Sequence, residues 1–237
     1  MRVLAIVPAL DEARSLPGVV AGLRAAPVPL DVCVVDDGSS DDTARVAARA
    51  GAAVLRLPVN LGIGGAVQAG YLWARERGYD AAVQVDGDGQ HDPASLPALL
   101  APIADGRADL AVGSRFLAEG GFRSTAARRV GIRYLSWLLR LRSGARVTDA
   151  TSGFRAAGRR AIELFAASYP SDYPELEAIA LATRNGLSIV EVPVRMHERR
   201  HGRSSISSLR AVYYMVKVTA ALVILPLPRE RQDAAEG

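Results

Sequence analysis

The first 85 residues of the sequence repeat one pattern: a short apolar run, a polar turn, and a segment whose apolar residues recur at helical spacing. Strand, turn and helix units that follow one another favour a parallel sheet wrapped by helices. We therefore expect an α/β fold, a mostly parallel sheet flanked by helices, with its polar turns on one rim. The expected strands are 3–7, 32–35, 53–57, the run from 81, 110–115 and 187–194, and the expected helices are 16–23, 43–50, 64–77, 94–103 and 173–185.

The fourth apolar run ends in Asp86-Gly87-Asp88-Gly89-Gln90, followed by His91 and Asp92. Ligands bind at the carboxyl ends of strands in open α/β sheets. Oxygen-rich side chains suit Mg²⁺ or Mn²⁺ better than Zn²⁺, so Asp86, Asp88 and Gln90 are candidate metal ligands, with His91 or Asp92 as a further candidate. A hard ion with few protein ligands shares its coordination shell with phosphates, which predicts a diphosphate ligand. The alternative is an ordinary surface turn, which Asp-Gly sequences also form.

The composition indicates one sizeable globular domain. The chain has 237 residues, of which 49% are hydrophobic and 23% charged, and its net charge of +4 is carried by 28 arginines and one lysine, Lys217. The planar guanidinium suits phosphate oxygens, although a GC-rich genome also explains many arginines. The single cysteine, Cys33, lies in an apolar run, which predicts a buried structural thiol. Met1 leads directly into a strand without a secretory signal, so we expect a cytoplasmic protein.

Two segments are rich in arginine. Eight arginines and one acid, Glu119, lie between Arg115 and Arg146. A basic amphipathic helix here is typical of a segment lying on an anionic membrane, and a solvated helix packed on the sheet through its leucines explains the pattern equally well. With few stacking aromatics, we expect no nucleic-acid partner. The apolar positions are Ile132, Leu135, Leu138, Leu139 and Leu141, and the second basic group is Arg195, His197, Arg199, Arg200, His201 and Arg203.

Three other stretches predict structure rather than chemistry. Residues 211–227 are apolar but include Lys217 and are short for a bilayer span, so we expect an interfacial helix, or one that docks on a small membrane-protein partner, with a buried core helix as the alternative. The tail 229–237 is expected to be disordered. The glycines at 62, 64 and 65 lack the third glycine of a dinucleotide fingerprint, because position 67 is valine, so helix packing explains them better.

Seven short stretches, in this order, resemble family 2 of the inverting glycosyltransferases, and most closely the dolichyl-phosphate mannosyltransferase-like (polyprenyl-phosphate glycosyltransferase) branch. The resemblance covers about residues 3–205 and implies a Rossmann-like GT-A fold, with a catalytic domain 1–205 and an apolar helix within 206–228. The stretches are Val7-Pro8-Ala9-Leu10-Asp11-Glu12, Val35-Asp36-Asp37-Gly38-Ser39-Ser40-Asp41, Asn60-Leu61-Gly62, Asp86-Gly87-Asp88-Gly89-Gln90-His91-Asp92-Pro93, Gly113-Ser114-Arg115, Thr151-Ser152-Gly153-Phe154-Arg155 and Glu198-Arg199-Arg200-His201-Gly202-Arg203-Ser204.

The resemblance also implies a role for each matching residue. The base and ribose of a nucleoside-diphosphate sugar would contact the first two motifs, and a divalent ion would join the donor diphosphate to the fourth. Close relatives often carry lysine where Ser205 stands, so a role for that charge is not expected. The implied sets are Pro8, Asp11, Glu12, Asp36, Asp37, Asp86, Gln90, Arg199 and Arg203 for the donor; Asp86, Asp88 and Gln90 for Mg²⁺ or Mn²⁺; Arg115, Arg128, Arg129, Arg133 and Ser152 for the acceptor phosphate; and Asp88, Arg115 and Arg129 for catalysis.

The implied reaction moves a sugar from a GDP- or UDP-sugar to a polyprenyl phosphate at the cytoplasmic face of a membrane. A polyprenyl phosphate is already an anion, so the reaction needs no general base, whereas a hydroxyl acceptor would need one. The carboxylates available for that alternative are Asp92, Asp149 and Glu175. Two other functions remain as alternatives. A sugar-nucleotide pyrophosphorylase would require a glycine-rich loop after the first strand, whereas Pro8 to Glu12 is short and acidic. The other is a catalytically silent module recruited to membranes by its basic helices.

Overall fold

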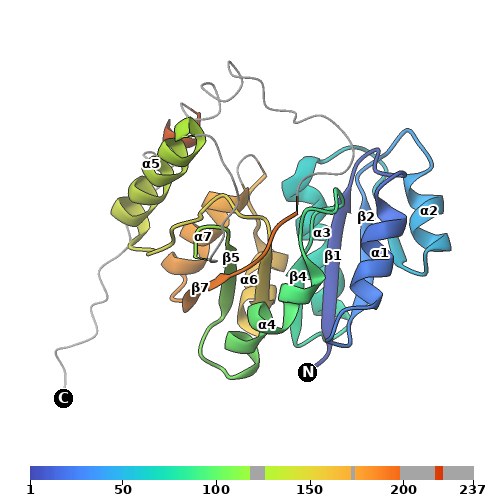
Figure 1. The fold of residues 1–237 in the computed structure, drawn as a ribbon, viewed down its shortest axis with the longest axis horizontal. Helices are drawn as coiled ribbons and strands as arrows, with labels where there is room; N and C mark the ends of the chain where they lie inside the picture. Colours follow the sequence, from blue (N-terminus) through green and yellow to red (C-terminus); the bar gives the residue numbers. More distant parts are fainter. Residues whose placement is uncertain (118–125, 172–173, 198–216, 221–237) are drawn as a thin grey trace.

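The computed structural model describes residues 1–117, 126–171, 174–197 and 217–220, without the side chains of 126–128. In this part of the chain, seven strands form one sheet in the order β3-β2-β1-β4-β6-β5-β7 (Figure 1). All neighbours pair in parallel except β6, which is antiparallel to β4 and β5. The predicted mostly parallel sheet is confirmed. The strands are β1 (Val3–Ala9), β2 (Asp31–Asp36), β3 (Ala53–Arg56), β4 (Ala81–Gln84), β5 (Leu110–Ser114), β6 (Arg155–Gly158) and β7 (Ile189–Pro193).

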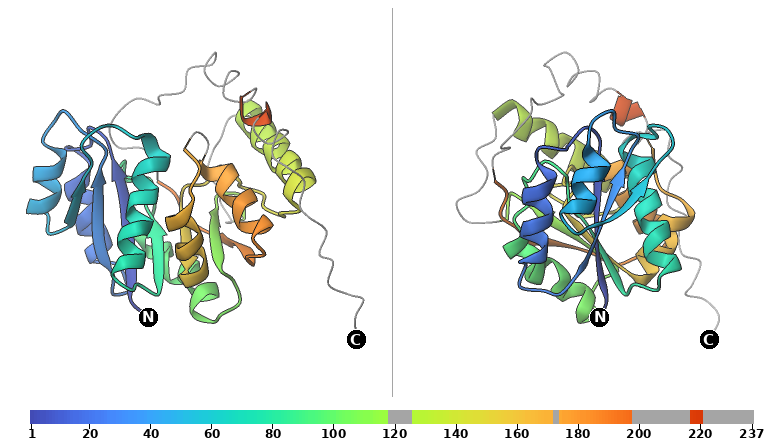
Figure 2. Two further views of the ribbon diagram at one scale, coloured as in Figure 1. Left: turned by 180° about the vertical axis from the view of Figure 1, so that it is seen from behind. Right: turned by 90° about the vertical axis from the view of Figure 1, so that its right-hand side faces the viewer.

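Helices cover both faces of the sheet and divide the core into two layers. Alternate residues of β1 point to opposite layers, because successive side chains of a strand face opposite ways: Leu4 and Ile6 pack with α3 and α6, whereas Val3 and Val7 pack with α1 and α4. The side covered by α3, α6 and α7 faces the viewer in Figure 2, left. The helices are α1 (Leu16–Arg24), α2 (Thr43–Arg49), α3 (Gly62–Glu76), α4 (Leu96–Ala104), α5 (Ala126–Ser143), α6 (Arg159–Ala167) and α7 (Pro174–Arg184), with a short 3₁₀ turn at Pro93–Ser95.

The expected end of the first strand at residue 7 is wrong, because β1 continues through Pro8 to Ala9. The carbonyl of Ile6 accepts from Val85 on the β4 side, and the carbonyl of Ala9 accepts from Asp37 on the β2 side. Alternation along the strand therefore directs the nitrogen of Pro8 towards β4, where the register ends at Ile6 and Gln84. The missing N–H of proline thus costs no hydrogen bond in the sheet.

Two structural expectations about single residues are confirmed. Cys33 is fully buried on the α3 side of β2, and burial raises the pKa of its thiol to about 11. Gly64 lies where α3 approaches the segment before α7. A Cβ on Gly64 would lie 2.2 Å from the carbonyl oxygen of Pro170, closer than any side chain tolerates. Gly64 therefore serves helix packing, as expected for the glycine run.

Helix α5 lies at the opposite end of the molecule from α2 (Figure 1). Ile132, Leu135, Leu138 and Leu139 are at most 6% exposed, and the three leucines share one core cluster with residues of α7. Each buried leucine contributes roughly 1.5–3 kcal/mol, so this face holds the helix on the molecule. Leu141, predicted on the same face, is 62% exposed. The packed-helix interpretation is confirmed for four of the five apolar positions.

The carboxyl-terminal predictions lie mostly outside the described residues. Of the apolar segment 211–227, the structure describes Lys217–Ala220, where Val218 is fully buried. Within the described part of the chain, no helix combines the length and the apolar character needed to cross a bilayer. The boundary at residue 205 and the tail 229–237 remain predictions.

Candidate active site

Three of the predicted site residues, Asp36, Asp86 and Arg115, lie at one rim of the sheet. Asp36 ends β2, Asp86 follows β4 by two residues, and Arg115 follows β5 directly. Since β1, β2, β4 and β5 run in the same direction, their carboxyl ends lie together. Arg155, the first residue of the antiparallel strand β6, pairs with Gln84 of β4 and Val112 of β5, so the loop before β6 also enters at this rim.

The loops after β1 and β2 are joined by side chains predicted to bind the donor. Asp11 has a left-handed backbone (φ 54°), and its Oδ1 accepts from the backbone N–H of Ser40 at 2.8 Å. Oδ1 of Asp37 accepts from the N–H of Leu61 at 2.7 Å, and Oε2 of Glu12 accepts from the hydroxyl of Ser15 at 2.6 Å. The three carboxylates thus fix the shape of these loops. Their contact with a donor stays a prediction.

Asp36 differs from these neighbours. It is 1% exposed, and its Oδ1 accepts from the backbone N–H of Ser39 at 3.0 Å. Among the described residues its buried Oδ2 has no hydrogen-bond donor, and it forms an ion pair of 3.5 Å with Nε of Arg56. A buried acceptor left without a hydrogen bond costs free energy. An N–H or O–H group of a ligand would therefore be stabilised at this oxygen.

The Asp86–Gln90 turn is not an ordinary surface turn. Asp88 is 7% exposed, and its Oδ1 accepts from the backbone N–H of Gln90 at 3.0 Å. A Cβ on Gly87 would lie 3.2 Å from the carbonyl oxygen of Pro8, so the turn lies against the end of β1. The side chain of Asp86 is 39% exposed. The two carboxylates therefore occupy the rim itself, one buried and one open to solvent.

The donor set fits a hard cation that also binds a ligand. Within the described residues, no three His, Cys, Asp or Glu side chains come together as a metal site. Asp86 and Asp88 would supply two carboxylates and Gln90 an amide oxygen, since its Nε2 donates to the carbonyl of His197 at 3.4 Å. Mg²⁺ commonly takes one or two carboxylates and completes its shell with phosphates and water. These residues fit that mode of binding.

The loop Thr148–Phe154 lies against this turn. A Cβ on Gly153 would lie 3.0 Å from Oδ1 of Asp86, so only glycine permits this approach without displacing the carboxylate. Ser152, predicted to bind the acceptor, is 1% exposed, and its Oγ accepts from the N–H of Phe154. Its hydroxyl therefore stabilises the loop, and the acceptor contact stays a prediction.

Arg115 is held by Asp149, a pairing that the sequence did not predict. Nε and Nη2 of Arg115 donate to the two carboxylate oxygens of Asp149, each at 2.7 Å, and the backbone N–H of Arg115 adds a bond of 3.1 Å. Oε1 of Glu191 accepts from the backbone N–H of Asp149 at 2.7 Å. Both partners are buried. Arg115 therefore fixes the loop beside the carboxylate turn, and its predicted contact with an acceptor phosphate is not tested.

Arg155 is a second site residue that sequence reasoning missed. It is 1% exposed and donates to the carbonyl oxygens of Ser152, Ala150 and Glu175, at 2.8, 3.1 and 2.5 Å. Its Nη1 is buried without a partner in the described residues. The guanidinium ties the loop to α7. The sequence signal that could have identified Arg155 was its position at the end of the sixth motif, directly after Gly153 and Phe154.

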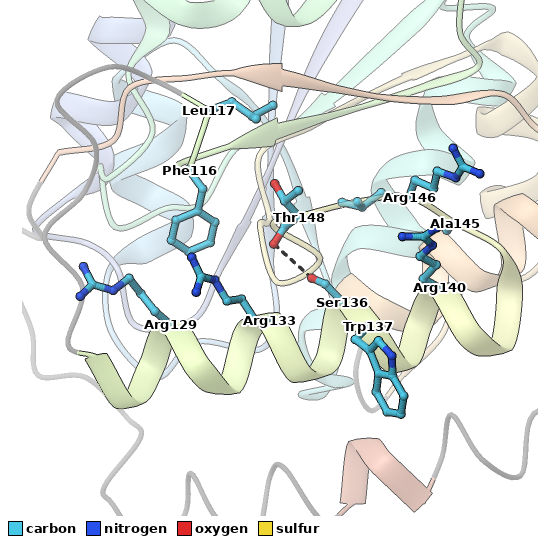
Figure 3. Close-up of a pocket in the computed structure, with 11 residues that line it drawn as sticks. Phe116, Leu117, Arg129, Arg133, Ser136, Trp137, Arg140, Ala145, Arg146 and Thr148 are labelled. Atoms are coloured by element: carbon cyan, nitrogen blue, oxygen red, sulfur yellow. Dashed lines mark hydrogen bonds between the residues drawn. The ribbon is translucent and has the colours of Figure 1, made fainter.

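A groove of about 580 Å³ lies between α5 and the residues that follow β5, and we call it the arginine groove (Figure 3). Arg129 and Arg133 were predicted at the acceptor, whereas Arg140 and Arg146 were not. The spacing 129, 133, 136 and 140 places these positions on one helical face. This spacing was the sequence signal that could have identified Arg140. The lining residues are Phe116, Leu117, Arg129, Arg133, Ser136, Trp137, Arg140, Ala145, Arg146, Val147 and Thr148.

Three predicted site residues lie outside the description. The side chain of Arg128 is not described, although its backbone belongs to α5, and Arg199 and Arg203 lie in the segment 198–216. His91, considered as a further metal ligand, is 6% exposed and stacks on Phe154 with ring centroids 4.6 Å apart. Burial lowers the pKa of His91, against the opposing charges of Asp86 and Asp88.

Comparisons with known proteins extend these observations. The sequence matches the family model described as "Glycosyl transferase family 2" over residues 4–165. It is 38% identical to an undecaprenyl-phosphate mannosyltransferase of Micrococcus luteus, across 87% of this chain and 88% of that one. It is 34% identical to a polyprenol monophosphomannose synthase of Mycolicibacterium smegmatis, across 100% and 91%. Glucosyl-3-phosphoglycerate synthase of Mycobacterium tuberculosis, solved with Mg²⁺ and UDP, has the same fold: the TM-score is 0.71, with 23% identity over 95% of this chain and 80% of that one.

Proposed function

Because this chain belongs to glycosyl transferase family 2 and is a glycosyltransferase with the GT-A fold, we propose that it transfers a sugar from a nucleoside-diphosphate sugar to a polyprenyl phosphate at the cytoplasmic face of a membrane. Two relatives with over 30% identity are named for undecaprenyl-phosphate and polyprenol mannose transfer. Mannose is therefore the first sugar to test, and the acceptor is a polyprenyl phosphate.

One observation carries the proposal: the loop Thr148–Phe154 joins the carboxylate turn to the arginine groove. At one end Gly153 touches Asp86, and at the other Thr148 lines the groove and accepts through its carbonyl from Ser136. The pair of Arg115 and Asp149 fixes the loop next to Thr148. A donor diphosphate at the turn and an acceptor phosphate in the groove would thus lie on two sides of one segment of the chain.

On the donor side, Asp86, Asp88 and Gln90 would hold Mg²⁺ or Mn²⁺, and Asp36 would accept from the base or ribose. A bound divalent ion acts as a Lewis acid that stabilises the charge on a departing diphosphate. The related fold of the Mycobacterium tuberculosis synthase was solved with UDP and Mg²⁺, which supports divalent-metal use here. Pro8, Asp11, Glu12 and Asp37 would shape the nucleotide pocket through the loops that they fix.

On the acceptor side, Arg129 and Arg133 would bind the phosphate, with Arg115 between the groove and the turn. Two anions repel one another, so guanidinium groups that hold them in line supply orientation and electrostatic stabilisation. Two of the three candidate bases are engaged: Asp149 binds Arg115, and Asp92 accepts from the N–H of Ala94 at 3.0 Å. An acceptor that needs no base is favoured.

One observation favours the alternative of a hydroxyl acceptor. Desolvation raises the pKa of Glu175, and the charge of Asp86 adds to this, against the opposing charge of Arg155. A carboxyl group with a raised pKa suits general-base catalysis. A Glu175→Gln enzyme separates the two reactions: transfer to a phosphate acceptor should continue, whereas base-catalysed transfer to a hydroxyl should fall by about 10²-fold or more.

The direct test is transfer of radiolabelled mannose from its GDP and UDP forms to a short polyprenyl phosphate, with Mn²⁺. We expect label in an organic-extractable product with inverted anomeric configuration, and loss of transfer in Asp88→Asn. Arg129→Ala/Arg133→Ala should raise KM for the acceptor about tenfold. Arg107→Ala is the matched control, because it removes an exposed arginine from the turn before β5, at the opposite rim. Its KM for the acceptor should equal that of the parent. Transfer only to water-soluble glycans would overturn the proposal.

A further inference from the structure

Helix α5 has three faces, of which the core and the arginine groove account for two. The third is one residue further round the helix from the groove-lining positions 129, 133, 136 and 140. Its side chains are apolar, recur at the same spacing, and are 39–66% exposed. We call this set the apolar stripe: Val130, Tyr134, Trp137 and Leu141.

Such a stripe is unusual on a helix of a globular protein. Single exposed apolar residues are common, but several in line mark a binding surface. Trp137 belongs to both the stripe and the lining of the groove, and Figure 3 shows its ring projecting from α5 away from Arg133. The stripe and the groove are therefore neighbouring surfaces of one helix.

The charge of α5 identifies the kind of partner. Its eighteen residues contain five arginines and no acidic residue. Arg129, Arg133 and Arg140 lie on the face next to the stripe and are exposed. A helix with apolar residues beside a row of cations is suited to the interface of an anionic bilayer, where apolar side chains enter the acyl boundary and cations meet lipid phosphates.

A second segment with apolar character meets α5 on this side. Lys217–Ala220 is the described part of the apolar segment 211–227, and the hydroxyl of Thr219 lies 3.3 Å from that of Tyr134. Val218 is buried in the same core cluster as Leu138. The two segments that the sequence marks for a membrane surface thus come together in the fold.

We propose that α5 is the membrane-docking element, with the apolar stripe inserted into an anionic bilayer and the arginine groove opening at the level of the headgroups. An acceptor phosphate would then reach the groove while its prenyl chain stays in the bilayer. This link to the acceptor rests on the proposed function, whereas the docking itself does not. Apart from Leu141, the inserted face differs from the leucine face that the sequence suggested, because Leu135, Leu138 and Leu139 are buried in the core.

Tryptophan fluorescence of the full chain tests the proposal. The chain has two tryptophans, and Trp73 lies under the guanidinium of Arg77 at 3.3 Å, so Trp73→Phe leaves Trp137 as the reporter. With vesicles of phosphatidylcholine and phosphatidylglycerol (3:1), we expect its emission to shift to the blue and acrylamide quenching to fall at least twofold. Vesicles of pure phosphatidylcholine should give a weaker effect, because they lack the anionic charge.

Co-sedimentation measures the contribution of the stripe. Val130→Asn/Leu141→Asn should lower the vesicle-bound fraction about tenfold without changing Tm, since both side chains are exposed. Val59→Asn, an equally exposed position (58%) in the loop before α3, should bind vesicles like the parent. Unchanged binding by the double variant would overturn the proposal. So would a Trp137 that is already shielded from quencher without vesicles, which would mean that the chain or a second copy covers the stripe.

A water-soluble short-chain prenyl phosphate separates docking from catalysis. Without vesicles, the double variant should transfer sugar to it within about twofold of the parent rate. Loss of this transfer would assign the stripe to the catalytic groove and overturn the docking role. Vesicle binding by a parent enzyme that uses no prenyl phosphate would overturn the proposed function and leave the docking face supported.

Discussion

Both ring nitrogens of His91 face Asp86. Nδ1 accepts from the backbone N–H of Asp86 at 3.1 Å, and Nε2 lies 3.5 Å from Oδ2 of the same residue. Because Nδ1 is an acceptor, the neutral ring carries its proton on Nε2, directed at a predicted metal ligand. His91 is thus a positioning residue for Asp86, and its nitrogens are not directed at a cation.

His91→Ala should weaken both the fold and the metal site. It leaves the N–H of Asp86 without its partner, which costs about 1–3 kcal/mol, and removes the group that orients the carboxylate, which should weaken Mn²⁺ binding about tenfold. Urea unfolding and the rise in Tm with Mn²⁺ and UDP measure the two effects. In His91→Asn the amide oxygen stands near the place of Nδ1, so part of the stability should return. An unchanged Mn²⁺-dependent rise in His91→Ala would contradict the positioning role.

The pair of Arg115 and Asp149 should be strongly coupled. Asp149→Asn leaves a buried guanidinium without its counter-charge, for which we expect a loss of about 3–5 kcal/mol. Arg115→Met removes the other partner and should cost a similar amount. The double variant leaves no unpaired charge, so its loss should be well below the sum of the single losses. Urea unfolding of the four proteins completes the cycle, and additive losses would show that the two residues act independently.

Cys33 should be inert in the native protein. Burial raises the pKa of its thiol to about 11, so about one molecule in a thousand carries a thiolate at pH 8, and the side chain is fully buried. Reaction with a disulfide reagent needs an exposed thiolate. We expect modification at pH 8 only at the rate of unfolding, and at once in urea. Since the chain has one cysteine, absorbance reports this site alone, and fast stoichiometric labelling of the native state would refute the expectation.

The carboxylates at the rim could be predicted because they follow strands. Asp36 and Asp86 come at or just after apolar runs, and parallel strands place such positions together without knowledge of any distant contact. Local patterns therefore sufficed for six of the seven strands and for the carboxylates at their ends. The roles of Asp11 and Asp37 in fixing loops were not predictable, because they depend on which backbone N–H groups the neighbouring loop presents.

The rest of the site depends on long-range pairing. Asp149 lies 34 residues from Arg115, and no spacing rule joins them. Strand β6 has the sequence Arg-Ala-Ala-Gly, whose low strand propensity is overcome by pairing on both edges. Helix α5 has two apolar sets that both recur at helical spacing. One is the buried leucines at 135, 138 and 139, and the other is the exposed stripe at 130, 134 and 137. The sequence cannot say which is buried, because α7 decides it.

Glu175 gives a pH dependence whose sign is fixed. Desolvation raises the pKa of its carboxyl group in the folded chain above the ordinary 4.5. Between these two values the folded chain binds more protons than the unfolded chain, so stability falls as pH rises from 4.5 through the folded pKa. Glu175→Gln cannot ionise. Its Tm should therefore rise relative to that of the parent as pH increases from 4.5 to 8.

Scanning calorimetry across this pH range measures the difference. Glu163→Gln, an exposed glutamate of α6, removes the same formal charge and corrects for the net effect of losing a negative charge on the whole molecule. The advantage of Glu175→Gln over Glu163→Gln should be smallest near pH 4.5, where the parent's Glu175 is still protonated in the folded state. An advantage that is constant with pH would mean that Glu175 ionises alike in both states, and its candidacy as a base with a raised pKa would fall with it.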